Sequence, residues 1–136
     1  MTRRLLVMLA LAACCRAGDP AREVLDLVAD AAGALSAGNV SLFMKAFDPA
    51  MAGYATLREN VTALIAQGEV QSLIEPLEDE GDERRRVDTF QWSLRWKRGE
   101  NSASFARREQ VVTCKAEKQG GKWRIVALEP IAFFAP

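Results

Sequence analysis

Hydrophobic residues recur at helical spacing in the first half of the chain and at a spacing of two in the second half. The helical spacing begins just after Asp19 and Pro20. Aspartate caps free helix amides and proline fits a first helical turn, so the first helix is expected to start here. Gly38 is expected to end it. Its apolar stripe consists of Val24, Leu27, Val28, Ala31 and Leu35.

Two more helices are predicted before the spacing changes. Asn39 suits the cap of a short second helix, which ends at Asp48 because the residue before Pro49 avoids helical geometry. A third helix is predicted from about Gly53 to Gln67, with a glycine as its stop. The two apolar stripes comprise Val40, Phe43, Met44 and Phe47, then Tyr54, Leu57, Val61, Leu64 and Ile65.

Four strands are predicted after Gly68, over residues 69–77, 84–97, 104–117 and 122–134. The second alternates most clearly, with Phe90, Trp92, Leu94 and Trp96 on one face. An acidic segment, 78–83, is interpreted as the first turn, and residues 98–101 as the second. Gly120 and Gly121 suit a tight hairpin. Pro130 interrupts the last strand, which implies an edge, a bulge or a bend there.

Three helices followed by four antiparallel strands indicate the α+β class. The sheet needs cover for its apolar face, and the amphipathic helices are the segments that can supply it. We therefore expect the sheet to curl around the first and third helices. We therefore predict one domain over residues 18–136, preceded by an N-terminal signal segment over residues 1–17.

The N-terminal segment, residues 1–17, has the features of an export signal. Arg3 and Arg4 precede a short apolar run over residues 5–13. This run is shorter than the roughly 20 apolar residues that a membrane-spanning helix needs. The protein is therefore expected to be exported.

Two processing routes are open. Residues 11–14, Leu-Ala-Ala-Cys, resemble the bacterial lipobox, which implies cleavage before Cys14 and lipidation of that cysteine. Ordinary cleavage after Ala17 would instead release a secreted protein. The expected location is the periplasm or outer cell envelope, lipid-anchored in the first case. Any membrane association is expected only through that lipid.

Composition narrows the chemistry. The 136 residues hold 18 basic and 18 acidic side chains, and removal of residues 1–13 takes away two arginines, leaving a net charge of −2. This balance argues against a nucleic-acid partner. The chain has no histidine, so it lacks the usual zinc ligand and the base of Ser-His and Cys-His pairs. No metal or cofactor is expected, and Cys114 is interpreted as a small buried hydrophobe.

Two segments carry a resemblance to a known superfamily. They are residues 37–49, Ala-Gly-Asn-Val-Ser-Leu-Phe-Met-Lys-Ala-Phe-Asp-Pro, and residues 120–125, Gly-Gly-Lys-Trp-Arg-Ile. In their order and spacing they resemble the nuclear transport factor 2-like, or SnoaL-like, superfamily, over roughly residues 20–134. The resemblance implies a strongly curved, cone-shaped sheet of the cystatin-like kind. It also implies a pocket between the concave face and the helices, and homodimers through the outer face. It implies little about chemistry, because this scaffold carries both enzymes and binding proteins.

Asp88 is the first candidate for chemistry, because alternation places it on the aromatic face of its strand. A carboxylate beside aromatic walls has a raised pKa and can act as a general base. Tyr54 and Arg108 are candidates for stabilising the negative charge that would then develop. Each has a plainer alternative. Asp88 would lie solvated at the strand end or pair with Arg84 or Arg86, Arg108 would form a cross-strand ion pair on the outer face, and Tyr54 would pack in the core.

An apolar ligand pocket is the second candidate feature. Its predicted lining is Phe43, Phe47, Tyr54, Asp88, Phe90, Trp92 and Trp96. Residues at these spacings also suit an ordinary hydrophobic core, so the two interpretations stand side by side.

Three functions follow. The first is a cell-envelope binding or accessory domain without catalysis, with a small apolar pocket or a protein-binding sheet face. The second is an isomerase- or hydrolase-type enzyme acting on a small hydrophobic substrate through Asp88. The third is a structural partner that docks through the apolar residues 131–134, if these extend beyond the sheet.

Overall fold

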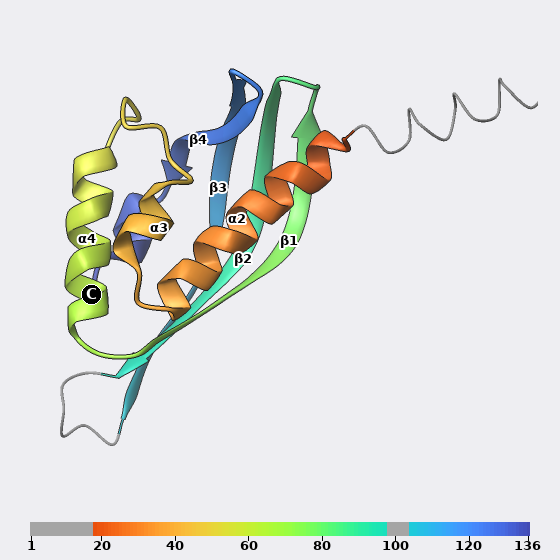
Figure 1. Cartoon of the computed structure of the whole chain (residues 1–136). Coiled ribbons are helices and arrows are strands. Elements are labelled where there is room, and N and C mark those ends of the chain that lie inside the picture. The colour runs from red at the N-terminus through yellow and green to blue at the C-terminus, as the bar shows by residue number, and fades with distance from the viewer. Residues whose placement is uncertain (1–17, 98–103) are drawn as a thin grey trace, which may run out of the picture.

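The computed structural model describes residues 18–97 and 104–136, so the predictions for residues 1–17 and for the turn at 98–101 lie outside the described residues. Four antiparallel strands form one sheet in the order β1-β2-β3-β4. They are β1 (Val70–Gly81), β2 (Arg85–Lys97), β3 (Phe105–Gln119) and β4 (Lys122–Glu129). The helices lie on one face of this curved sheet (Figure 1). The predicted α+β class with three helices on a curved four-stranded sheet is confirmed.

Helix α2 (Pro20–Ser36) begins and ends where the sequence predicts. The Asp19 side chain accepts a hydrogen bond from the amide of Ala21 at 3.1 Å, and Gly38 adopts a left-handed φ of 69° beyond the last turn. Helix α4 (Tyr54–Ala66) also matches its prediction.

Helix α3 (Val40–Met44) is shorter than predicted. The amide of Asp48 donates to the carbonyl of Ile125 at 2.9 Å, and the amide of Ile125 donates to the carbonyl of Ala46 at 2.8 Å. These backbone groups therefore bond to β4 rather than continuing the helix, which ties the α3 end to the sheet.

Strand β1 runs further than predicted and absorbs most of the acidic segment that was interpreted as a turn. Glu80 and Gly81 still pair with Val87 and Arg86 of β2. The actual turn is short, and the Asp82 side chain closes it by accepting from the next backbone amides at 2.8 and 2.9 Å.

The last predicted strand is wrong beyond Pro130. Strand β4 stops at Glu129, and Ile131–Phe134 forms a 3₁₀ helix, η1. Proline offers no amide to the sheet, so the chain turns inward there. Phe133 and Phe134 are 2% and 0% exposed. The proposal that residues 131–134 extend outward to dock a partner therefore loses its support.

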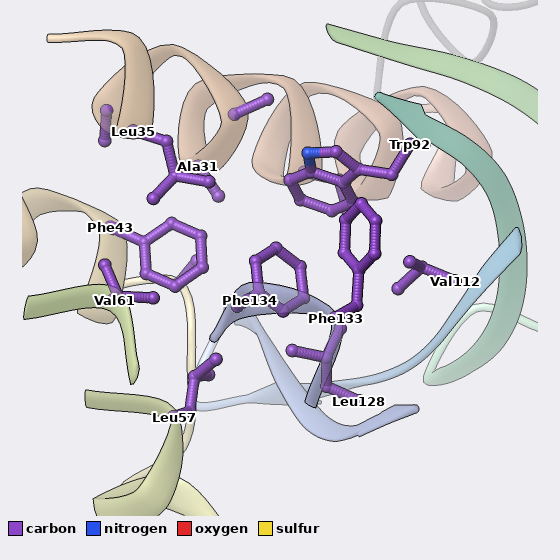
Figure 2. Packing of buried hydrophobic residues seen from close by; sticks show 14 of the residues in the cluster. Ala31, Leu35, Phe43, Leu57, Val61, Trp92, Val112, Leu128, Phe133 and Phe134 are labelled. Carbon is purple, nitrogen blue, oxygen red and sulfur yellow. The ribbon is translucent and has the colours of Figure 1, made fainter. Parts of the chain in front are cut away.

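The core lies between the helices and the sheet, and η1 fills its centre. Figure 2 shows the Phe134 ring between Phe43 and Trp92, with Phe133 beside it. The Phe134 centroid lies 5.0 Å from Trp92, 5.8 Å from Phe43 and 5.0 Å from Phe133. Helix α2 packs on β1, whereas α4 packs mainly on η1 and α3. The third helix thus covers the sheet through η1 rather than directly.

The three tryptophans each satisfy their indole N–H. Trp92 donates to the Ser72 hydroxyl at 2.8 Å, Trp96 to the Gln67 side chain at 3.0 Å, and Trp123 to Glu23 at 2.6 Å. The last of these joins α2 to β4, so the two ends of the fold are linked by a charge-assisted hydrogen bond.

Candidate functional site

A β-bulge in β1 decides which acidic residue meets Asp88. Pro76 pairs with Phe90 of β2, but the register then shifts by one residue, so that Glu78 pairs with Thr89 and Asp79 with Asp88. Directly opposed residues share a face of the sheet. The extra residue therefore turns Asp79, rather than Glu78, toward the helix-covered face where Asp88 lies.

Asp79 forms a two-point ion pair with Arg86. The guanidinium Nε and Nη2 donate to the two Asp79 oxygens at 2.9 and 2.7 Å, and Nη1 donates to the backbone oxygen of Asp82 at 3.0 Å. This contact holds the pKa of Asp79 below its usual range and raises the pKa of Arg86. The positive charge of Arg86 is therefore committed to Asp79. Of the two arginines expected as partners of Asp88, one is bound to a different carboxylate.

Asp88 is itself buried, with 3% of its surface exposed, and its Oδ1 has no hydrogen-bond partner among the described residues. Burial raises the pKa of Asp88 to about 7, and the hydrogen bond and charge of Asp79 act in the same direction. Across on β3 its neighbour is Cys114. Burial raises the pKa of that thiol to about 12, with a smaller contribution from Asp88. Cys114 is a free, buried cysteine, and the raised pKa keeps it protonated.

A pocket of about 280 Å³ lies beside Asp88, between the start of α2 and the strands β1 and β2. Its apolar wall consists of Ala21, Leu25, Pro76, Leu77 and Phe90. Its charged lining consists of Asp19, Arg22, Glu78, Asp79 and Asp88. An apolar wall with a few convergent polar groups is typical of a small-molecule site.

The predicted pocket lining divides into two groups. Asp88 and Phe90 line the pocket just described. Phe43, Phe47, Trp92 and Trp96 are absent from its lining and pack in the core. The concave space of the sheet is filled by the chain's own η1 (Figure 2).

Tyr54 and Arg108 lie away from Asp88. Tyr54 opens α4 and packs partly buried against the core. Arg108 pairs with Leu94, six residues along β2 from Asp88, a separation of about 20 Å at strand spacing. Its Nη1 donates to the carbonyls of Phe133 and Ala135 at 2.6 and 2.5 Å. Arg108 therefore holds the C-terminal segment in place, and neither side chain accompanies Asp88.

The partner that sequence reasoning missed is Asp79. It lies in the acidic segment interpreted as a turn, and strict alternation would have placed Glu78 opposite Asp88. Pro76 was the available signal, because proline within a strand marks an edge or a bulge.

The outer face of the sheet holds a second, larger hollow of about 460 Å³, with Gln71, Leu73, Ser93, Arg95, Arg107 and Glu109 among its lining. Leu73 is 71% exposed, and the Arg95 guanidinium stacks 4.1 Å above the centroid of the exposed Phe105 ring. This face is therefore both apolar and charged.

No protein-family model matches the chain, and no curated protein resembles it in sequence. Solved structures do resemble it. An NTF2-like protein with a cystatin-like fold from Novosphingobium aromaticivorans has a TM-score of 0.66 at 17% identity, covering 87% of this chain and 84% of its own. A nuclear transport factor 2-like superfamily protein from Salmonella enterica has a TM-score of 0.65 at 13% identity, covering 79% and 86%.

A protein of unknown function from Mycobacterium tuberculosis has a TM-score of 0.66 at 16% identity, covering 78% of this chain and 67% of its own. The chain has the nuclear transport factor 2-like, cystatin-like fold. At these identities the likeness concerns architecture. Within this fold, function has to be argued from the site, and here the site is the pocket beside Asp88.

Two further findings concern residues 18–97 and 104–136. Within these ranges no cluster of three or more acidic or cysteine side chains is placed to hold a metal ion. No helix in the same ranges is long and apolar enough to cross a membrane.

Proposed function

We propose that this chain is a small-ligand-binding domain and that the ligand occupies the pocket beside Asp88. One observation carries the proposal: a buried carboxyl group with an unpartnered oxygen forms part of an otherwise largely apolar pocket. A buried polar group without a partner costs about 1–3 kcal/mol. A ligand that supplies a hydrogen-bond donor removes that cost, while its apolar part covers the wall.

Binding fits the surroundings of Asp88 better than catalysis. General-base chemistry on a small substrate leaves negative charge that a donor or cation has to stabilise. Arg86 is committed to Asp79, the Cys114 thiol is covered, and Tyr54 and Arg108 lie elsewhere. The cation left in the lining is Arg22, which is exposed and shares the pocket with Asp19, Glu78 and Asp79, so it is not reserved for charge that develops beside Asp88.

Proton transfer remains the second candidate, and a specific observation favours it. The pKa of about 7 at Asp88 suits a group that exchanges protons near neutral pH. As an enzyme, the domain would act on a small hydrophobic substrate whose own polar group stabilises the charge. Turnover lost in Asp88→Asn would support this candidate over simple binding.

The protein-binding alternative is a homodimer through the outer face of the sheet. Leu73, Phe105 and Val111 are 71%, 45% and 48% exposed there. Arg107 and Glu109 both line the outer hollow, so the face carries both signs of charge and suits pairing with a second copy of itself. Native mass spectrometry of wild type and Leu73→Lys tests it. A dimer lost in the variant supports the interface, and a wild-type monomer at micromolar concentration removes it.

We also propose that the domain works outside the cytoplasm, lipid-anchored through Cys14. The support is the arginine pair, the short apolar run and the Leu-Ala-Ala-Cys sequence at residues 11–14. The mass of the mature protein from an exporting bacterial host tests this. A chain that starts at Cys14 with a lipid supports the anchor, and one that starts at Gly18 supports secretion without it.

The test of the ligand pocket is a fragment titration followed by NMR of the backbone amides. Fragments that bind as proposed shift the amides of Ala21 and Phe90 in the wild type, and these shifts weaken in Asp88→Asn. Asp30→Asn is the matched control, because it removes the same charge from an exposed position of α2. Shifts that are equal in all three proteins, or that avoid the pocket, would rule out this site.

A further inference from the structure

We infer that the ligand of the Asp88 pocket is a small organic cation, an amine with a compact apolar body. This inference rests on the proposed binding function and names the chemical class that the pocket selects. It is carried by the balance of charge around the buried carboxyl group, by the lining of the pocket mouth and by the pocket's size.

The charges of Asp88 and its neighbours do not cancel. Asp79 and Arg86 neutralise one another through their two-point ion pair, at 2.7 and 2.9 Å. Cys114, which faces Asp88 from β3, is neutral. Arg86 also attracts Asp88, but it is one positive charge beside two carboxylates, so ionisation of Asp88 leaves these three groups with a net charge of −1. A ligand ammonium group is the complement of that charge, and it also donates the hydrogen bond that Asp88 Oδ1 lacks.

The mouth of the pocket favours the same sign of charge. Helix α2 contributes Asp19 and Arg22, and β1 contributes Glu78 and Asp79. Arg22 thus shares the lining with three acidic residues besides Asp88, one of which is already paired with Arg86. An anionic ligand would enter against a net negative surface, whereas a cation is attracted to it.

The apolar wall sets the size of the cation. The volume of about 280 Å³ lies near the lower end of the roughly 300–1,000 Å³ that is usual for small-molecule sites. Leu25, Pro76 and Phe90 offer aliphatic and aromatic surface but no further polar side chain. A single ring that carries an aminomethyl group matches this space. A long polyamine would place further positive charges against the apolar wall, where no carboxylate pairs with them.

Amine binding has a signature that neutral ligands lack. A cation binds the ionised form of Asp88, so binding displaces the proton that the free protein holds at neutral pH. With a pKa of about 7, Asp88 is about one-tenth ionised at pH 6 and about nine-tenths ionised at pH 8. An alkylamine stays protonated at both pH values. The affinity for the amine should therefore rise about tenfold between pH 6 and pH 8.

The experiment compares benzylamine with benzyl alcohol, which has the same shape without the charge. Both are titrated into the mature protein at pH 6 and pH 8, with the amides of Ala21 and Phe90 as reporters. The proteins are wild type, Asp88→Asn and the control Asp30→Asn. Amide spectra of each variant establish that it is folded. The expected result is benzylamine binding that tightens about tenfold at pH 8, is lost in Asp88→Asn and is retained in Asp30→Asn.

The possible outcomes distinguish failure of the amine inference from failure of the proposed ligand-binding function. If benzyl alcohol binds as tightly as benzylamine and neither affinity depends on pH, the pocket binds ligands but does not select cations, and the inference is overturned. If the amine shifts only acidic surface residues outside the pocket, the inference is overturned as well. If no fragment of any charge perturbs Ala21 or Phe90, both the inference and the proposed function fail.

Discussion

Replacing Asp88 with asparagine should stabilise the folded protein increasingly as the pH rises from 4 to 8. Asparagine keeps the shape of the side chain and removes its titration. In the wild type, the pKa of Asp88 is about 7 in the fold, against an ordinary value of 3.8. Below pH 3.8 both folded and unfolded chains hold the proton. Between the two values the unfolded chain releases it while the folded chain keeps it, so the free energy of unfolding falls as pH rises.

The size of the effect follows from the two pKa values. Each pKa unit corresponds to about 1.4 kcal/mol, so complete ionisation of Asp88 costs the fold at most about 4 kcal/mol. Roughly a third of this is already lost at pH 5, because the unfolded chain is by then ionised. The difference in unfolding free energy between Asp88→Asn and wild type should therefore grow by up to about 3 kcal/mol from pH 5 to pH 8.

Urea denaturation followed by tryptophan fluorescence measures this difference. With a typical denaturant slope of about 2 kcal/mol per molar, the midpoints of variant and wild type should diverge by up to about 1.5 M between the two pH values. The wild-type value is subtracted from that of Asp88→Asn because other groups also titrate over this pH range. Asp48 and Asp82 have lowered pKa values, so in both proteins they contribute stability above their ordinary pKa of 3.8 that is lost as the pH falls. Parallel stability profiles for the two proteins from pH 5 to pH 8 would refute the reasoning.

Asp79→Asn tests the cause of the shift. Without the Asp79 carboxylate, Arg86 is free to pair with Asp88, and the repulsion that raises the pKa of Asp88 is removed. The pH-dependent loss of stability should shrink and move to lower pH. An unchanged profile would show that desolvation alone sets the pKa of Asp88.

Three shorter predictions concern the core. Ser72→Ala should cost about 1–3 kcal/mol, since it leaves the buried indole N–H of Trp92 without its 2.8 Å partner, and urea denaturation measures the loss. Phe134→Ala should cost about 3–5 kcal/mol, because it empties a fully buried site at the centre of the aromatic cluster, and thermal unfolding by circular dichroism checks this. Cys114 should resist thiol reagents in the folded protein and react on unfolding, as peptide mass spectrometry would show, since it is 0% exposed and its pKa is about 12.

Much of the secondary structure could be predicted from local signals. Asp19, Pro20 and Gly38 mark the ends of α2 because capping and left-handed backbone are properties of a few neighbouring residues. The alternation of Phe90 and Trp92 along β2 is equally local, and both residues are buried on the face predicted.

The features that could not be predicted depend on pairing across the sheet. The bulge between Pro76 and Glu78 is a property of two strands in register, and it alone brings Asp79 to Asp88. The buried position of Asp88 followed from alternation, but its neighbours did not. The location of Arg108 likewise depends on a segment 25 residues away, whose carbonyl it binds.

The hydrophobic pattern of the sequence also did not predict that residues 131–134 fill the concave side of the sheet. The pattern predicts that residues 131–134 end the last strand. In the structure the chain turns inward after Glu129, and this turn makes these residues part of the core. As a result, aromatic residues that the sequence predicted to line a pocket pack around Phe134 instead.

The position of η1 has a consequence for how the chain acquires its structure. Phe133 and Phe134 sit at the centre of the core, yet they are made after every helix and strand that surrounds them. The indole of Trp123 meets Glu23 across 100 residues of sequence. During synthesis, helix α4, which packs mainly on η1 and α3, therefore emerges with much of its apolar face unmatched until these late residues leave the ribosome. Completion of the core is therefore expected to be a late event in the folding of this chain.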